Sequence, residues 1–170
     1  MKIAICPGTF DPITNGHLDL IRRGLRMFEE VIIAVAANPK KEPFFPLEER
    51  FKLITQSIKN DKNARVETFS GLLVDYAKLR GGSAIIRGLR AISDFEYELQ
   101  MALMNRRLDM NIETVFMMPS EEYSFLTSTI VKEVASLGGS VHGLVPEVVE
   151  NAIKERFKIM REPSAGGGSV

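Results

Sequence analysis

The stretch CPGTFDPITNGH, Cys6–His17, joins a short apolar run, KIAIC, to a segment whose apolar residues recur at helical spacing. Its two prolines and two glycines are typical of a turn that ends a strand and precedes a helix. The stretch therefore predicts a strand-turn-helix unit, with Thr9 at the tip of the sheet and His17 in the first turn of the helix.

The same alternation continues along the chain. Five strands are predicted from runs rich in apolar and β-branched residues, at 2–6, 31–37, 64–69, 83–87 and 114–118. Helices are predicted where apolar residues recur at spacings of three and four, or where the composition is helical. They comprise Leu18, Ile21, Leu25 and Phe28; Leu47, Phe51, Ile54 and Ile58; and the segments 71–79, 94–108, 127–137 and 146–157.

Strands that are apolar along their whole length and alternate with helices are typical of a parallel sheet covered on both faces. We therefore expect an α/β fold, a doubly wound five-stranded parallel sheet with right-handed crossovers. Such sheets bind ligands beyond the carboxyl ends of the strands, where the loop Cys6–His17 is expected to lie. One domain is predicted at 1–160, followed by a flexible Gly- and Ser-rich tail at 161–170.

Composition limits the classes of function. The 170 residues hold 22 basic and 22 acidic side chains, so the formal net charge is zero. A duplex-binding protein needs a surplus of lysine and arginine, and we expect no nucleic-acid partner. The sequence has no apolar run long enough to span a membrane and one cysteine, so a cytoplasmic protein without a membrane partner is expected.

Cys6 and His142 have side chains that often take part in catalysis, but the sequence predicts structural roles for both. Cys6 is predicted to be a small buried hydrophobe, because one thiol with no His or Asp nearby in sequence is a weak candidate for a nucleophile. His142, in SVHGLVP, matches no motif and is predicted to be a satisfied loop or cap histidine.

The helix that opens at His17 is a candidate anion site. Gly16 allows a ligand to approach the backbone closely, and the N–H groups and dipole of a helix start favour a phosphate. Neither GxGxxG nor GxxxxGK[ST] occurs, so the loop is neither a dinucleotide-binding turn nor a Walker-type loop. An ordinary loop with a surface histidine as helix cap is the alternative interpretation.

A second candidate is IIRGLRAISDFEYE, Ile85–Glu98, which closes the fourth predicted strand. It places Arg87 and Arg90 at the carboxyl end of that strand, where two guanidiniums suit phosphate oxygens. The alternative is that the two arginines are solvated or paired with a carboxylate such as Asp94 or Glu96.

A third candidate is LTSTIVK, Leu126–Lys132, where a helix start offers hydroxyls and amides to an anion. Ser128 or Thr129 is expected to cap this helix, and a plain cap without a ligand is the alternative. PGTFDPITNGH and LTSTIVK resemble the two signatures of the nucleotidyltransferase superfamily, G-[ST]-F-D-P-x-[HT]-x-G-H and I-S-S-[ST]-x-x-[RK]. Leu126 and Thr127 replace the usual Ile and first Ser.

The arginine string, the T-x-G-H form of the first signature and NPKKEPFFPLEER (Asn38–Arg50) closely resemble the bacterial phosphopantetheine adenylyltransferase family. The similarity runs from Lys2 to about Phe157. It implies a reaction of coenzyme A biosynthesis, in which ATP and 4'-phosphopantetheine give dephospho-coenzyme A and pyrophosphate. It also implies Mg²⁺ carried with ATP, for which no protein ligands are assigned, and a homohexamer built as a dimer of trimers.

The same resemblance implies roles for individual residues. The phosphate of phosphopantetheine would attack ATP in line without a covalent intermediate, with His17 and Lys41 as catalytic residues and Arg87 as the phosphate anchor. Contacts with phosphopantetheine are implied for Thr9, Lys41, Leu73 and Arg87. Contacts with ATP are implied for Thr9, Phe10, His17, Gly88, Leu89, Arg90, Glu98, Tyr123, Ser124, Phe125, Leu126, Thr127, Ser128 and Thr129.

Two alternative functions stay open. One is another small-molecule nucleotidylyltransferase, acting on nicotinamide mononucleotide or glycerol phosphate, although those enzymes commonly carry His where Thr14 stands. The other is a non-catalytic nucleotide-binding sensor, because fold and phosphate loops alone do not establish turnover.

The helix predicted at 94–108 carries two apolar stripes on different faces. One arrangement buries them against the sheet and a neighbouring helix of the same chain, and the other buries one of them against another copy. The stripes are Phe95, Leu99, Ala102 and Leu103, and Tyr97, Met101, Met104 and Leu108.

Overall fold

The structure is a computed structural model and describes residues 2–37, 42–90 and 92–161. Strands and helices alternate as predicted. The strands are β1 (Ile3–Gly8), β2 (Glu30–Ala36), β3 (Ala64–Phe69), β4 (Gly82–Gly88) and β5 (Glu113–Met117). The helices are α1 (Asn15–Gly24), α2 (Leu47–Ser57), α3 (Leu73–Leu79), α4 (Ile92–Leu108), α5 (Ser128–Ser136) and α6 (Glu147–Arg161), with the 3-10 turn η1 (Glu121–Tyr123) before α5.

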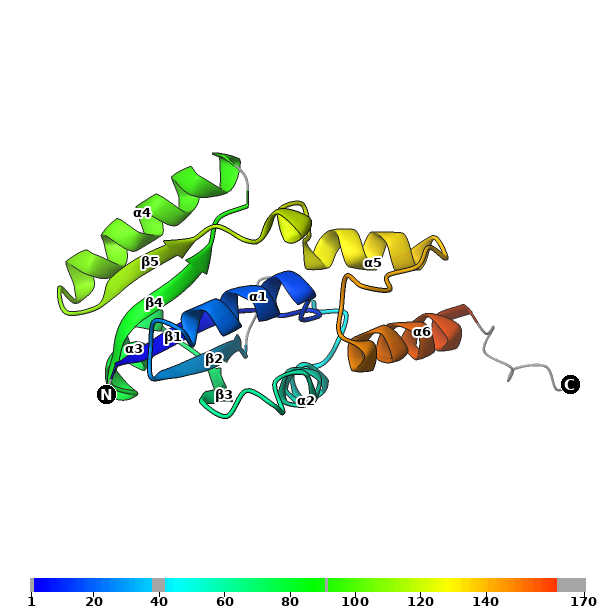
Figure 1. Cartoon of the computed structure of the whole chain (residues 1–170), viewed down its shortest axis with the longest axis horizontal. Coiled ribbons are helices and arrows are strands. Elements are labelled where there is room, and N and C mark those ends of the chain that lie inside the picture. The colour runs from blue at the N-terminus through cyan, green and yellow to red at the C-terminus, as the bar shows by residue number, and fades with distance from the viewer. Residues whose placement is uncertain (1, 38–41, 91, 162–170) are drawn as a thin grey trace, which may run out of the picture.

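The five strands form one parallel sheet in the order β3-β2-β1-β4-β5, which confirms the predicted doubly wound fold. The chain runs outward from β1 to β3 and then returns to place β4 on the other side of β1. The strand order therefore reverses between β1 and β4, the place where such sheets hold their ligands. In Figure 1 the strand arrows point toward the end of the molecule where α5 and α6 lie.

Each face of the sheet has its own core. On one face, strand residues such as Cys6 and Ile33 pack with α1, α2, α5 and α6. On the other face, Ile5, Ile32 and Ile85 pack with α3. Because successive strand residues point to opposite faces, a sheet covered on both sides requires strands that are apolar throughout.

Helix α4 lies over β5 and beside α3 but leaves most of its apolar side chains exposed in the single chain. Both predicted apolar stripes contain exposed side chains, so the described residues of the single chain do not bury the stripes against the sheet and a neighbouring helix. The exposed fractions lie between 38% and 60% for Phe95, Tyr97, Leu99, Met101, Leu103, Met104 and Leu108.

Two details of the predicted helices are wrong. Helix α1 ends at Gly24, so Leu25 and Phe28 pack against the core from the turn that follows it. In α2 the predicted apolar face includes Phe51, which is 37% exposed, whereas the neighbouring Arg50 is 1% exposed. Arg50 is buried because its guanidinium donates hydrogen bonds to three backbone carbonyls.

The structural roles given to Cys6 and His142 are confirmed. Cys6 is buried, and its burial raises the pKa of the thiol to about 11. Nδ1 of His142 lies 3.1 Å from Oε2 of Glu150, so this loop histidine has a partner. No helix in the described ranges combines the length and the apolar character needed to cross a membrane. The predicted tail lies outside the described residues, apart from Arg161 at the end of α6.

Candidate active site

A cavity of about 1110 Å³ opens beyond the carboxyl ends of β1 and β4. The last residues of both strands line it, Pro7 and Gly8 in β1 and Arg87 and Gly88 in β4. The first turns of α1 and α5 border the same space. A Cβ at position 88 would overlap the side chain of Leu20, so glycine lets β4 pass close to α1 here.

Thr14 and His17 form a capping box at the start of α1. Thr14 is the N-cap, and its Oγ1 accepts a hydrogen bond from the His17 backbone N–H over 3.3 Å. The Thr14 backbone N–H donates in return to Nδ1 of His17 over 3.0 Å. A histidine thus takes the place that Glu or Gln holds in the usual capping box. Because Nδ1 accepts, the ring proton of the neutral imidazole lies on Nε2, and His17 is among the residues that line the cavity.

The surroundings of His17 keep its ring neutral. Burial, followed by the positive charges of Arg90 and Arg87, lowers the pKa of His17 to about 4. The Phe10 ring packs edge-on against the imidazole, with ring centroids 5.1 Å apart. Phe10 itself has φ 49°, a left-handed conformation that is uncommon for a non-glycine residue. At neutral pH, His17 therefore presents an uncharged Nε2–H donor.

Arg87 is held at the cavity wall by Glu98 of α4. Nε of Arg87 donates to Oε2 of Glu98 over 2.7 Å, Nη2 donates to Oε1, and Nη1 donates to the Pro7 carbonyl over 3.1 Å. Burial acts to lower the pKa of Arg87, but the hydrogen bond and charge of Glu98 outweigh it and raise that pKa. The sequence left open a pairing of Arg87 with a nearby carboxylate such as Asp94 or Glu96. It does pair with a carboxylate, and the partner is Glu98.

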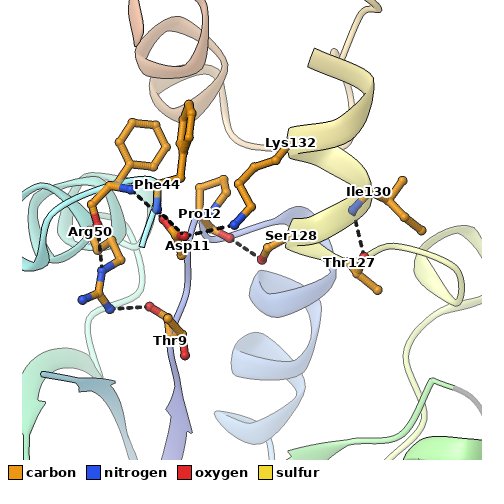
Figure 2. A network of polar contacts seen from close by, with 10 residues as sticks. Thr9, Asp11, Pro12, Phe44, Arg50, Thr127, Ser128, Ile130 and Lys132 are labelled. Atoms are coloured by element: carbon orange, nitrogen blue, oxygen red, sulfur yellow. Dashed lines mark hydrogen bonds and ion pairs between the residues drawn. The ribbon is translucent and has the colours of Figure 1, made fainter. Parts of the chain in front are cut away.

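The first turn of α5 is fastened to the loop that follows β1. Thr127 is the N-cap, since its Oγ1 accepts the Ile130 N–H over 3.0 Å. Ser128 donates instead from Oγ to the Pro12 carbonyl over 2.7 Å (Figure 2). The prediction that Ser128 or Thr129 caps this helix is therefore wrong, because the Ser128 hydroxyl is used by a partner 116 residues away.

Asp11 accepts hydrogen bonds from two distant segments. Its Oδ2 accepts from the Phe44 N–H over 2.7 Å and from Nζ of Lys132 over 3.0 Å, and its Oδ1 accepts from the Phe45 N–H over 2.8 Å. Figure 2 shows the carboxylate between the loop before α2 and the first turns of α5. The sequence gives no sign of this role, because a turn-forming Asp-Pro pair explains the residue locally.

Arg50 braces the same region from α2. Its Nη1 donates to the carbonyls of Thr9 over 2.7 Å and Ala36 over 3.1 Å, and its Nε donates to the carbonyl of Phe45 over 3.1 Å. Burial lowers the pKa of Arg50, while the charge of Asp11 acts in the opposite direction. The ends of β1 and β2 and the loop before α2 are thereby held together.

The cavity brings together most residues implied as ligands by the resemblance. Leu89, Ser124, Phe125 and Leu73 are not among its lining residues. Leu73 is the first residue of α3 and packs, half-buried, against the core on that face of the sheet. Lys41 lies outside the described residues. All the contacts with ATP and phosphopantetheine implied by the resemblance stay predictions, those of the lining residues included. The implied residues that line the cavity are Thr9, Phe10, His17, Arg87, Gly88, Arg90, Glu98, Tyr123, Leu126, Thr127, Ser128 and Thr129.

A family model described as cytidylyltransferase-like matches residues 5–134, which include the capping box of α1 and the first turns of α5. The chain belongs to the cytidylyltransferase-like family. Its activity is therefore that of a nucleotidyltransferase. A solved structure from Vibrio parahaemolyticus, described as a nicotinate-nucleotide adenylyltransferase, superposes with a TM-score of 0.70 at 18% identity. The match covers 92% of this chain and 95% of the other, and it shows a shared fold.

The charges in the cavity of this cytidylyltransferase-like chain suit an anionic substrate. Arg87, Arg90 and Lys132 line it. Of the three acidic residues that line it, Asp11 pairs with Lys132 and Glu98 pairs with Arg87, and the third is Glu42. Within the described ranges, no three His, Cys, Asp or Glu side chains are grouped to bind a metal ion.

Proposed function

We propose that this chain transfers the adenylyl group of ATP, bound as its magnesium complex, to 4'-phosphopantetheine, giving dephospho-coenzyme A and pyrophosphate. The observation that carries the proposal is the convergence of the Nε2 edge of His17, the guanidiniums of Arg87 and Arg90 and the first turn of α5 on one cavity. Each comes from a segment that resembles the phosphopantetheine adenylyltransferases.

The reaction needs alignment and charge stabilisation more than acid-base chemistry. The phosphate of phosphopantetheine is a nucleophile near neutral pH. One of its oxygens forms a bond to the α-phosphorus of ATP while the bond to the bridging oxygen of pyrophosphate breaks. Neutral His17 donates from Nε2 to the phosphate oxygens as negative charge redistributes, and Lys41 is proposed to add a positive charge.

Arg87 is proposed to anchor the acceptor phosphate. Its guanidinium is already oriented by Glu98 and the Pro7 carbonyl, so little side-chain freedom remains to be lost when a substrate binds. In this arrangement Glu98 contributes by orienting Arg87, and its assigned contact with ATP would have to share the same carboxylate.

A nicotinate mononucleotide acceptor is the second candidate, favoured by the description of the similar Vibrio parahaemolyticus structure. The part of the cavity beside β2 and β3 supports phosphopantetheine instead. It is lined by Ala36, Pro43 and Phe69, which are apolar, and by the carboxylate of Glu42. An apolar wall suits the pantetheine arm, whereas Glu42 would repel the carboxylate of nicotinate.

Pyrophosphate release from MgATP tests the function, with 4'-phosphopantetheine, nicotinate mononucleotide, nicotinamide mononucleotide and glycerol phosphate supplied separately. Release with phosphopantetheine alone is expected. Release with nicotinate mononucleotide alone would select the second candidate, and no release with any acceptor would identify a nucleotide-binding sensor.

We also propose that the chain assembles as the homohexamer implied by its resemblance. The exposed apolar side chains of α4 support this assembly, because monomers rarely leave so large an apolar surface in water. Sedimentation equilibrium should give a mass several times the 19.0 kDa of one chain. Met104→Glu should reduce that mass, and Leu137→Glu, at a position 82% exposed outside α4, should not. A wild-type monomer at micromolar concentration would contradict the proposal.

A further inference from the structure

Asp11 stands apart from the other acidic residues of the cavity because of what it joins. Its carboxylate is 6% exposed and accepts three hydrogen bonds, two from the backbone N–H groups of Phe44 and Phe45 and one from Lys132. Lys132 lies 121 residues further along the chain. One carboxylate therefore connects the loop after β1, the loop before α2 and the first turns of α5 (Figure 2).

Of the groups held by Asp11, Lys132 belongs to the wall of the cavity, and the amides of Phe44 and Phe45 directly follow two residues of that wall. Lys132 lines it with a side chain that is 30% exposed, and Glu42 and Pro43 line it immediately before the amides of Phe44 and Phe45. Asp11 itself is a lining residue. A change at Asp11 would thus alter the outline of the cavity and the position of a cation within it.

The bonds around Asp11 leave few other ways to hold these groups. The Phe45 carbonyl is taken by Arg50, which also holds the carbonyl of Thr9, and the Pro12 carbonyl is taken by Ser128. The amides of Phe44 and Phe45 are buried or half-buried and donate to no other acceptor among the described residues. Loss of the carboxylate would leave two donors short of an acceptor and one ammonium without its counterion.

We propose that Asp11 is a positioning residue of the active site. It holds Lys132 in the arrangement that receives the phosphate end of the nucleotide, and the amides of Phe44 and Phe45 hold the carboxylate itself in place. It acts through these groups and makes no bond to the reacting atoms. The inference rests on the proposed function only for its activity readout, because its main readout is binding of MgATP without an acceptor.

The test uses the full chain with Asp11→Asn, which keeps the shape of the side chain and removes its charge. Its dissociation constant for MgATP should rise about 10-fold, and its kcat should fall about 10²-fold, the loss typical of a misplacement near 1 Å. KM for phosphopantetheine should change less than twofold, because Arg87, the proposed anchor of that substrate, is held by Glu98 and the Pro7 carbonyl, and because asparagine keeps one oxygen that can accept from the amides of Phe44 and Phe45. If the Michaelis constants for MgATP and for phosphopantetheine rose together, the substitution would have disturbed the whole cavity, and the proposal would be overturned.

Lys132→Met and the double variant separate positioning from simple loss of stability. If Asp11 acts partly through Lys132, the effects of the two substitutions on MgATP binding must be less than additive. Full additivity would overturn the proposal. Lys132→Met is also the safeguard if Asp11→Asn does not fold, since its side chain is partly exposed. It must then weaken MgATP binding at least about 5-fold, and a dissociation constant within twofold of wild type would overturn the proposal.

Glu150→Gln is the matched control. Glu150 is 8% exposed, pairs with His142 and Lys154, and is not among the lining residues of the cavity. It should lose stability without a change in MgATP binding, whereas a change as large as that of Asp11→Asn would overturn the proposal. If wild type binds MgATP but transfers nothing to phosphopantetheine, the proposed function fails while the binding experiment on Asp11 still decides this inference.

Discussion

Nδ1 of His17 accepts the backbone N–H of Thr14 over 3.0 Å, and Oγ1 of Thr14 accepts the backbone N–H of His17 over 3.3 Å. One reciprocal pair therefore caps α1 and selects the tautomer of the imidazole. The T-x-G-H spacing has a structural cause, since the cap and its third helical residue must be three positions apart.

His17→Ala should reduce kcat about 10²- to 10³-fold, the loss measured when one preorganised donor to a developing charge is removed. His142→Ala is the control, since this histidine pairs with Glu150 outside the cavity and should leave kcat unchanged. Steady-state pyrophosphate release measures both variants. Equal activity of His17→Ala and wild type would remove His17 from the mechanism.

Thr14→Val should lower the free energy of unfolding by about 1 kcal/mol, because it removes the side-chain acceptor of the N-cap while keeping the volume. Thr14→Ser should restore most of this loss, since serine caps as well as threonine. Urea denaturation followed by circular dichroism gives both values. Equal stability of the valine variant and wild type would show that the hydroxyl does not support α1.

The low pKa of His17 predicts how stability depends on pH. The folded state holds this pKa at about 4, against 6.5 in the unfolded chain, so between these values the unfolded state binds more protons. Stability is therefore lost as pH falls from 6.5 toward 4, by up to about 1 kcal/mol per pH unit from this group. Urea titrations of wild type and His17→Gln across that window should show a smaller slope for the variant. If the stability of wild type and His17→Gln changed with pH at the same rate, the low pKa of His17 in the folded state would be contradicted.

Arg87→Lys should raise KM for phosphopantetheine at least about 10-fold with a smaller change in kcat. Lysine keeps the charge but cannot make the two-bond pair with Glu98 and reach the Pro7 carbonyl as well. An anchor used equally before and in the transition state affects KM rather than kcat. Initial rates with each substrate varied in turn provide the measurement, and a defect limited to KM for ATP would show that Arg87 serves the nucleotide.

Arg50→Met should lower the free energy of unfolding by about 3 kcal/mol, since it leaves three carbonyls without a donor in the interior. Arg65→Met is the matched control. Arg65 also makes several contacts, with Glu30 and Glu67, but it is 49% exposed, and its loss should change stability by less than about 1 kcal/mol. Similar losses of unfolding free energy in both variants would show that the buried hydrogen bonds of Arg50 stabilise the fold no more than the exposed ion pairs of Arg65 do.

The strands, the helices and the position of His17 could be predicted because their causes are local. Apolar periodicity and turn residues act over a few positions, and the capping box spans only Thr14 to His17. The buried side of α2 could not be predicted in the same way. A period of 3.6 residues does not show that Arg50 will meet carbonyls from the loop after β1, from β2 and from the loop before α2, and these bonds alone make its burial favourable.

The amino-acid sequence by itself determined the doubly wound sheet, the position of His17 in the first turn of α1 and the clustering, at the carboxyl ends of β1 and β4, of residues predicted to bind phosphate. Only the tertiary structure decided the partners of Asp11, Ser128 and Arg87. Their donors and acceptors come from segments that only the packed chain brings within hydrogen-bond distance. A buried polar group is stable only when such a partner is present, so its role follows from the crossing of chain segments and not from its neighbours in sequence.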